Sequence, residues 1–145
     1  MKTHARWLIA ALFFTASALA VADDRAYTEG SVVEVTYIRT RPGMFDEYMK
    51  WVGSQRKQEM EAMKKAGVIL SYAVYAPTPR SPQEPDLILT VEYKNMAALD
   101  NLNEKVDPID AKIFGSIKAA DQSNIDRGKL REVLGSEIVR ELKLK

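Results

Sequence analysis

The chain has 145 residues, of which 46% are hydrophobic and 28% charged, and its formal net charge is +1. A near-neutral chain with interspersed charges has no electrostatic reason to bind nucleic acid, so that class of partner is excluded. The chain has no cysteine, which also excludes a disulfide framework and thiolate chemistry.

The first residues have the pattern of a secretory signal peptide. Lys2 and Arg6 form a basic start, residues 7–21 are almost wholly apolar, and a small-x-small motif ends at Ala22. The apolar run is shorter than the roughly 20 residues that a membrane-spanning helix needs. We therefore expect cleavage after residues 1–22 and a periplasmic or secreted protein that no longer contacts the membrane.

Cleavage would remove His4, the only histidine in the chain. Without His or Cys, the protein cannot form a serine-histidine-acid triad, a cysteine-histidine dyad, a histidine-ligated zinc site or a histidine- or cysteine-ligated haem site. We expect no metal site and no cofactor. Any catalysis would depend on carboxylates, Lys, Tyr, Ser or Thr, or on a bound cofactor.

Residues 23–30 are polar and predict a flexible leader before a single domain at 31–145. At the start of the domain, Val33, Val35 and Tyr37 alternate with polar residues, as in a strand with one apolar face.

Pro42 and Gly43 end this strand, and a helix is predicted over residues 44–66. Gly67 is well placed for the left-handed residue that follows a helix, and Gly53-Ser54 could bend the helix. The apolar stripe comprises Phe45, Tyr48, Met49, Val52, Met60 and Met63.

Renewed alternation predicts two more strands, at residues 68–76 and 87–94. Between them, the four prolines of residues 77–86 remove amide donors and favour an extended, solvent-facing hairpin loop. The spacing of Pro79 and Pro82 also fits a proline-rich ligand, so a lid or partner motif is an alternative to a plain connection.

The last part of the chain predicts helices followed by a strand. Asn95 can cap a helix that runs to about Lys105, and Pro108 interrupts it before a second helix. A further turn is predicted over 126–134, and a final strand over 136–145.

This order of elements is the βαββαβ unit of α+β ferredoxin-like folds, with an extra helix before the last strand. Two helices would cover one face of an antiparallel four-stranded sheet. The other face is too apolar for solvent and too polar for a core, so we expect a homodimer that buries it. That face would carry Val32, Glu34, Thr36, Ile38, Ser71, Ala73, Tyr75, Ile88, Thr90 and Glu92.

The passages Arg41–Tyr48, from first strand into first helix, and Thr90–Asn95, from third strand into second helix, resemble the dimeric α+β barrel superfamily. That superfamily includes the antibiotic-biosynthesis-monooxygenase-like, EthD-like and NIPSNAP-like domains. The resemblance spans roughly residues 31–145 and implies a homodimer whose two sheets enclose a cavity. Cofactor-independent oxygenases of the group use Asn, Trp or Tyr near the cavity, whereas packing explains Trp51 here.

We therefore expect an exported small-molecule-binding or accessory protein, with a small hydrophobic ligand. Two alternatives stay open: a cofactor-independent oxygenase or isomerase acting on a hydrophobic or aromatic compound, and a purely structural dimerisation domain. The candidate catalytic residues are Glu34, Glu92 and Tyr75, and the candidate ligand-binding residues are Thr36, Ile38, Ser71, Thr90 and Arg39.

Glu34 and Glu92 are expected on one sheet face, near each other in a partly enclosed cavity. Because burial and mutual repulsion disfavour two charges, at least one carboxyl should have a raised pKa. The alternative is that each pairs with a basic residue such as Arg140 or Lys94 and serves only the dimer.

Two other groups of charges are weaker candidates. Arg39, Arg41 and Arg80 could gather at one end of the sheet and hold an anion, or be ordinary surface charge. Four acidic residues lack the glycine and ligand spacing of a calcium loop and so predict a solvated acidic face rather than a cation site: Asp100, Glu104, Asp107 and Asp110.

Overall fold

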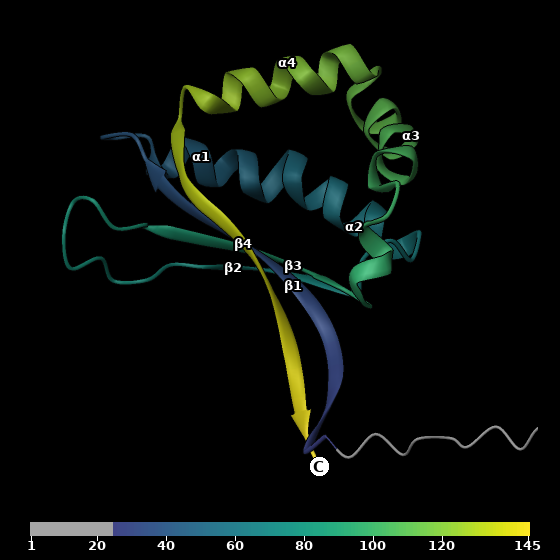
Figure 1. Cartoon of the computed structure of the whole chain (residues 1–145). Coiled ribbons are helices and arrows are strands. Elements are labelled where there is room, and N and C mark those ends of the chain that lie inside the picture. The colour runs from purple at the N-terminus through teal and green to yellow at the C-terminus, as the bar shows by residue number, and fades with distance from the viewer. Residues whose placement is uncertain (1–24) are drawn as a thin grey trace, which may run out of the picture.

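The computed structural model describes residues 25–145, so the expected signal peptide lies outside the described residues. Its four strands form one antiparallel sheet in the order β2-β3-β1-β4. All the helices lie on one face of this sheet (Figure 1). This is the α+β ferredoxin-like fold that the sequence predicts.

Strands and groups of helices alternate along the chain. In order, they are β1 (Tyr27–Thr40), α1 (Phe45–Trp51), the π-helical turn η1 (Val52–Arg56), α2 (Lys57–Lys65), β2 (Ser71–Tyr75), β3 (Leu87–Tyr93), the 3₁₀ turn η2 (Met96–Leu99), α3 (Leu102–Phe114), α4 (Ile117–Gly128) and β4 (Arg131–Leu144). None of the helices within residues 25–145 combines the length and the hydrophobicity that crossing a membrane requires.

The predicted first helix is confirmed as a continuous run of α1, η1 and α2. The π turn lies where Gly53-Ser54 predicts a bend, and the Ser54 hydroxyl donates to the carbonyl oxygen of Lys50 at 2.7 Å. Such hydrogen bonds to the preceding turn compete with the helical ladder and loosen it locally. The helix is followed by Gly67 at φ 73°, the left-handed residue that the sequence predicts.

The predicted interruption at Pro108 is wrong. Pro108 lies inside α3, and the break comes earlier, at Asn101, which has the left-handed φ of 52°. A proline inside a helix deprives the carbonyl four residues earlier of its donor, and here that residue, Glu104, is exposed to solvent. Asn95 is confirmed as a cap, since its side chain accepts from the Ala98 amide at 3.1 Å, but it caps only the short turn η2.

The predicted starting residues of β1 and β4 also need correction. Residues 27–30 belong to β1 rather than to a flexible leader, and β4 begins at Arg131, within the turn predicted over 126–134. Each strand has the other as its partner, from the pair Tyr27–Leu144 to the pair Thr40–Arg131. The resulting ribbon extends beyond the shorter strands β2 and β3 and projects from the body of the protein (Figure 1).

The face assignment of β1 is the opposite of the one predicted. Ile38 pairs with Leu87 and Val32 with Tyr93, and all four side chains are buried beneath the helices. Glu34 and Thr36 lie on this same face. Val33, Val35 and Tyr37 therefore lie on the open face. The sequence could not show which face of β1 is buried, because the strand carries apolar residues in both alternating sets.

The core fills the space between the sheet and the helices in two clusters. One packs β1 and β3 against α1 and η1, and the other packs β3 against α2 and α3. The buried members are Ile38, Tyr48, Val52, Leu87 and Leu89 in the first cluster, and Met60, Met63, Ile69, Val91 and Tyr93 in the second.

The turn at Pro42-Gly43 is a corner of the scaffold. The Thr40 amide donates to Asp86 Oδ1 at 3.0 Å, and the Asp86 amide donates to the Ile38 carbonyl at 3.0 Å. The Arg41 amide donates to the Leu130 carbonyl at 2.9 Å. These bonds fix the end of β1 to the start of β3 and to the segment that leads into β4.

Gly30 allows β1 to lie close to Glu141 of β4. A Cβ at this position would lie 2.9 Å from the Cβ of Glu141, too close for two carbon atoms. We predict that Gly30→Ala lowers the stability by about 1 to 3 kcal/mol, the usual cost of overpacking, as measured by urea denaturation. Gly128→Ala is the matched control, because a Cβ there meets no atom within 4 Å. Equal stability of the two variants would contradict the close approach.

Candidate functional site

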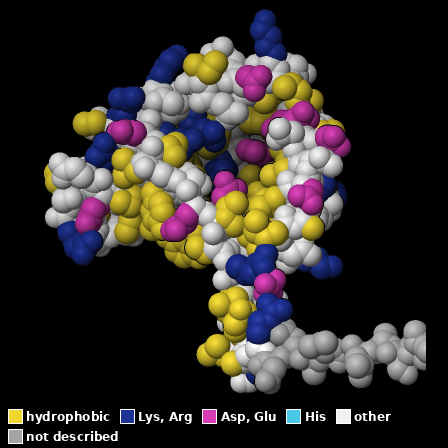
Figure 2. All heavy atoms as spheres, in the orientation of Figure 1, with side chains coloured by type: hydrophobic (Ala, Val, Ile, Leu, Met, Phe, Trp, Pro, Cys, Tyr) yellow, Lys and Arg dark blue, Asp and Glu magenta, His cyan; other side chains and the backbone are white. Residues whose placement is uncertain are grey.

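A cavity of about 280 Å³ lies between the helix-facing side of the sheet and the arch that α3 and α4 form over it. Its walls come from β1, β3, β4, η1, α2, α3 and α4. Figure 2 shows a hollow on one side of the molecule with basic and acidic side chains inside it. A cavity with several convergent polar groups is the usual setting of a ligand site.

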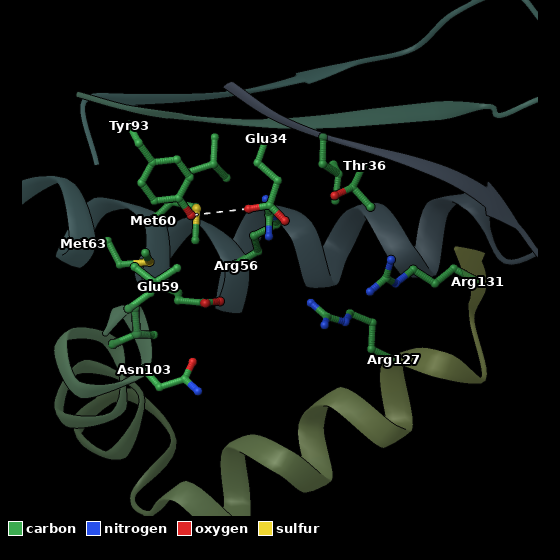
Figure 3. A pocket seen from close by; sticks show the side chains of 14 residues that line it. Glu34, Thr36, Arg56, Glu59, Met60, Met63, Tyr93, Asn103, Arg127 and Arg131 are labelled. Atoms are coloured by element: carbon green, nitrogen blue, oxygen red, sulfur yellow. Dashed lines mark hydrogen bonds between the residues drawn. The ribbon is translucent and has the colours of Figure 1, made fainter. Parts of the chain in front are cut away.

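The cavity exists because of two polar residues in β1. Glu34 and Thr36 occupy helix-facing positions between Val32 and Ile38, which are both 0% exposed. Carboxylate and hydroxyl groups do not pack into an apolar core without partners, so the helices cannot close over them as they do over the neighbouring residues. Glu34 and Thr36 point from the sheet into the cavity (Figure 3).

Three arginines from three different elements line the cavity: Arg56 from η1, Arg127 from α4 and Arg131 from β4. The Nε atom of each is buried without a hydrogen-bond partner, as is Nη1 of Arg131. Within residues 25–145, none of these three guanidinium groups forms an ion pair. Buried cations without partners are rare in stable cores.

Aromatic rings hold two of these arginines in place. The guanidinium carbon of Arg127 lies 4.4 Å from the centre of the Trp51 ring, and that of Arg131 lies 5.5 Å from the Tyr48 ring. The two rings are themselves stacked, 6.0 Å apart at an angle of 10°. Trp51 Nε1 also donates to Ser123 Oγ at 3.4 Å, which ties α1 to α4. Trp51 thus packs, as predicted, and in addition positions Arg127.

The pKa values of two of these arginines, Arg127 and Arg131, are lowered. Burial, together with the nearby charge of Arg131, lowers the pKa of Arg127 to about 10. Burial, followed by the Arg56 charge, also lowers the pKa of Arg131. A cation whose pKa is lower in the folded state destabilises that state at every pH below the lowered value. At neutral pH the full cost is therefore present, and it is relieved only as the pH rises through about 10.

Acidic and phenolic groups occupy the other part of the cavity. The Tyr93 hydroxyl donates to Glu34 Oε2 at 3.4 Å (Figure 3), and burial together with the Glu34 charge raises the pKa of Tyr93 to about 12. Tyr93 therefore stays protonated and can donate. Burial raises the pKa of Glu59 as well, and the charge of Asp110 adds to this. Chemically, the cavity offers cationic donors, one phenol and two carboxyl groups that can accept or hold protons.

The predicted catalytic pair does not form. Glu34 lies opposite Val91 in the sheet, whereas Glu92 lies opposite Val33, so the two carboxylates point to opposite faces. Glu92 accepts a hydrogen bond from Ser71 Oγ at 2.6 Å, and this bond lowers the pKa of Glu92. The expectation of a carboxyl pair with a raised pKa is therefore wrong.

The other candidate residues divide between the two faces. Thr36 lines the cavity, while Ile38 is fully buried in the core against Tyr48 and cannot reach a ligand. The open face carries the remaining sheet candidates, Ser71, Tyr75, Thr90 and Glu92.

The predicted anion site of Arg39, Arg41 and Arg80 is not supported. Arg39 pairs with Glu132 at 2.6 Å and donates to the Pro82 carbonyl, and Arg80 pairs with Glu84 at 2.9 Å. The hydrogen bond from Arg39 to Pro82 ties the proline-rich loop to the end of the sheet, whereas the Arg80–Glu84 pair lies within the loop.

The acidic group on α3 is only partly a solvated face. Asp100, Glu104 and Asp107 are exposed, but Asp110 is half-buried, and its Oδ1 has no hydrogen-bond partner. Across the part of the chain that the structure describes, no three acidic side chains are grouped to hold a metal ion.

Sequence reasoning missed the three arginines and Tyr93 as site residues. One signal was available: Arg56 follows Val52 by four residues and precedes Met60 and Met63 by four and seven, so it lies on the buried stripe of the first helix. A charged residue on such a stripe indicates a cavity or a partner. Arg127 and Arg131 gave no comparable signal, because they fall on either side of a helix–strand boundary that the sequence did not locate.

Comparison with solved structures identifies the fold. HapK from Hahella chejuensis is 12% identical, with a TM-score of 0.53 over 76% of this chain and 91% of HapK. A dimeric ferredoxin-like protein from an uncultured marine organism is 13% identical, with a TM-score of 0.51 over 81% of this chain and 98% of that protein. The sequence matches no protein-family model and no curated protein. The resemblance to dimeric α+β barrels is confirmed at the level of the fold.

The unpaired arginines lead to a prediction about stability. Replacing Arg131 with Met removes two buried nitrogens without partners and keeps an apolar side chain of similar length. The orphaned donors cost more than the contact with Tyr48 contributes, so we expect Arg131→Met to raise the melting temperature by roughly 4 °C. Arg39→Met, which breaks the pair with Glu132, is the control and should not raise it. A lower melting temperature for Arg131→Met would mean that the guanidinium supports the fold.

Proposed function

We propose that the protein is exported and binds a small molecule in the cavity between its sheet and its helices. One observation carries the proposal: three half-buried guanidinium groups, each with a buried Nε that has no hydrogen-bond partner, converge on a cavity of about 280 Å³. A purely structural domain would gain stability by replacing these groups with apolar residues. A ligand that pairs with them gives a reason for their presence. Export is inferred from the signal-peptide pattern of residues 1–22.

The cavity has the mixed lining that a small-molecule site requires. Its apolar surface comes from β3, α2 and α3, and its polar groups come mainly from β1, η1, α4 and the start of β4. An apolar surface provides affinity, while a few fixed polar groups orient the ligand. The volume is slightly below the usual range of roughly 300 to 1,000 Å³, which favours a compact ligand.

We further propose that the open face of the sheet is the interface of a homodimer. No helix within residues 25–145 covers this face (Figure 1), and rows such as Tyr37, Ile88 and Tyr75 leave large apolar groups on it. Tyr75 is 56% exposed. The dimeric ferredoxin-like protein with this fold supports the same arrangement here. The cavity is on the other face, so the ligand site and the interface are separate.

A cofactor-independent enzyme is the second candidate, and Glu34 is the observation that favours it. Its carboxylate projects into the cavity and accepts a hydrogen bond from Tyr93. Such a pair could move a proton to or from a bound substrate, with Glu34 as the base and Tyr93 as the donor. The isomerase form of this alternative requires only these two residues.

The binding proposal predicts a retained ligand. Native mass spectrometry of protein purified from its own host should show one small molecule of excess mass per subunit. Asn103→Trp should reduce this mass, because Asn103 is an exposed residue of α3 at the edge of the cavity and a Trp there would fill it. Asn124→Trp, on an exposed position of α4 outside the cavity, is the control. Equal retention in both variants would place the ligand elsewhere.

The dimer proposal predicts a charge-sensitive sheet face. Ile88→Asp places a carboxylate in the middle of the open face, so we expect the dimer to dissociate at least tenfold more readily in analytical ultracentrifugation. Ile125→Asp is the control, since Ile125 is 61% exposed on α4, away from the sheet. A wild-type protein that sediments as a monomer at micromolar concentration would contradict the proposal.

A further inference from the structure

The cavity has an electrostatic imbalance that its own residues do not correct. Three guanidinium groups face two carboxyl groups, Glu34 and Glu59, and neither carboxyl lies within ion-pair distance of an arginine among the described residues. Burial and the Asp110 charge favour the protonated form of Glu59, which increases the imbalance. The cavity is therefore net positive in a region where charge is poorly screened by water.

The positive charge is concentrated at one end. Arg127 and Arg131 extend toward the same part of the cavity from α4 and β4, beside Thr36 (Figure 3). The charge of Arg131 acts on Arg127 strongly enough to lower its pKa. Two guanidinium groups held near each other without an intervening carboxylate are repelled, and an oxyanion between them would reverse that repulsion.

Stacking on the aromatic rings prepares the arginines for this role. Trp51 and Tyr48 cover one side of Arg127 and Arg131 and limit the directions in which the two side chains can move. The planar guanidinium then presents its N–H donors at its edge, in the geometry that suits a carboxylate or another oxyanion. A side chain that is already held in place loses little freedom when a ligand binds.

The opposite end of the cavity carries most of its apolar side chains. Met60 and Met63 of α2 lie there with Tyr93 (Figure 3), and Val91 and Val106 pack in the same cluster. Methionine adapts to irregular shapes and makes favourable contacts with aromatic rings. This end therefore suits a flat or branched hydrocarbon body, and the Tyr93 hydroxyl, Glu34, Glu59 and Asn103 are available there for a polar substituent.

We propose that the ligand is a small amphipathic organic anion, with its oxyanion group between Arg127 and Arg131 and its apolar body against Met60 and Met63. The proposal rests on the proposed function and specifies the chemical class of the ligand. The volume of about 280 Å³ suits a monocyclic aromatic or short branched acid. Arg56 lies on the wall between the two ends and adds to the positive field.

Benzoate is a suitable probe because it combines a carboxylate with a compact apolar ring. Benzamide has the same shape without the charge, and acetate has the charge without the ring. Binding is measured by calorimetry and by the fluorescence of Trp51, which Arg127 contacts directly. The chain contains two Trp, and because Trp7 lies within residues 1–22, Trp51 is the only one left after the proposed cleavage.

We expect benzoate to bind at least tenfold more tightly than benzamide or acetate. Arg127→Gln and Arg131→Gln should each weaken benzoate binding by roughly 10- to 100-fold, the range expected for the loss of charge-assisted hydrogen bonds. Their affinity for benzamide should change less than twofold, which shows that the cavity is intact. Arg41→Gln removes an exposed arginine at the end of β1 and should leave all affinities unchanged.

Two outcomes would overturn the proposal in different ways. If benzamide binds in the cavity as tightly as benzoate, the site takes neutral molecules, and the proposed function stands without the anion. If none of the probes binds and Asn103→Trp has no effect on ligand retention, both the anion and the binding function are wrong. Benzoate binding that survives both arginine substitutions would place the anion outside this cluster.

Discussion

The structure depends on the two polar residues that β1 places on the helix-facing side of the sheet. Glu34 and Thr36 stand between Val32 and Ile38, which are fully buried, so the core closes on either side of them and not over them. The gap determines the course of the later chain, since α3 packs at its edge against α2 and β3 and α4 then arches over it. If both residues were apolar, the helices could settle on β1 in the manner of an ordinary two-layer α+β domain.

The elements that the sequence predicted well are those with a single strong pattern. β3 alternates clearly, because Leu87, Leu89, Val91 and Tyr93 face the core while two of the three residues between them, Thr90 and Glu92, are polar and face away. The first helix also has one apolar stripe and a glycine at its end. In β1, by contrast, Val33, Val35 and Tyr37 are as apolar as the buried set, because the open face of the sheet is itself apolar. Periodicity cannot distinguish two apolar faces, and the error moved Glu34 to the wrong side.

The candidate site was only partly predictable for a related reason. Its β1 members, Glu34 and Thr36, were named as candidates, but on the open face of the sheet, where a dimer partner was expected to cover them. The arginines lie far apart in the sequence, and their meeting depends on the length of α4 and on the residue at which β4 begins. Gly128 ends the helix and Arg131 starts the strand, a boundary with no proline and no distinct change of period. Long-range convergence of this kind follows from the tertiary fold and not from local pattern.

The same arch that leaves room for a ligand also gives it a route into the cavity. Among the described residues, α3 has no fully buried side chain, and α4 has only Ala120. Segments that bury few apolar side chains open at the lowest free-energy cost, so α4 can move away from the sheet more readily than α3, whose Leu102, Val106 and Ile109 pack against the second cluster. Arg127 travels with α4, whereas Arg56 and Arg131 stay with the body of the protein. Closing of the arch would therefore bring Arg127 to its position beside Arg131, and because the two cations repel each other, an anion between them would favour the closed arrangement. The repulsion between Arg127 and Arg131 therefore couples the binding of an anion in the cavity to the position of α4.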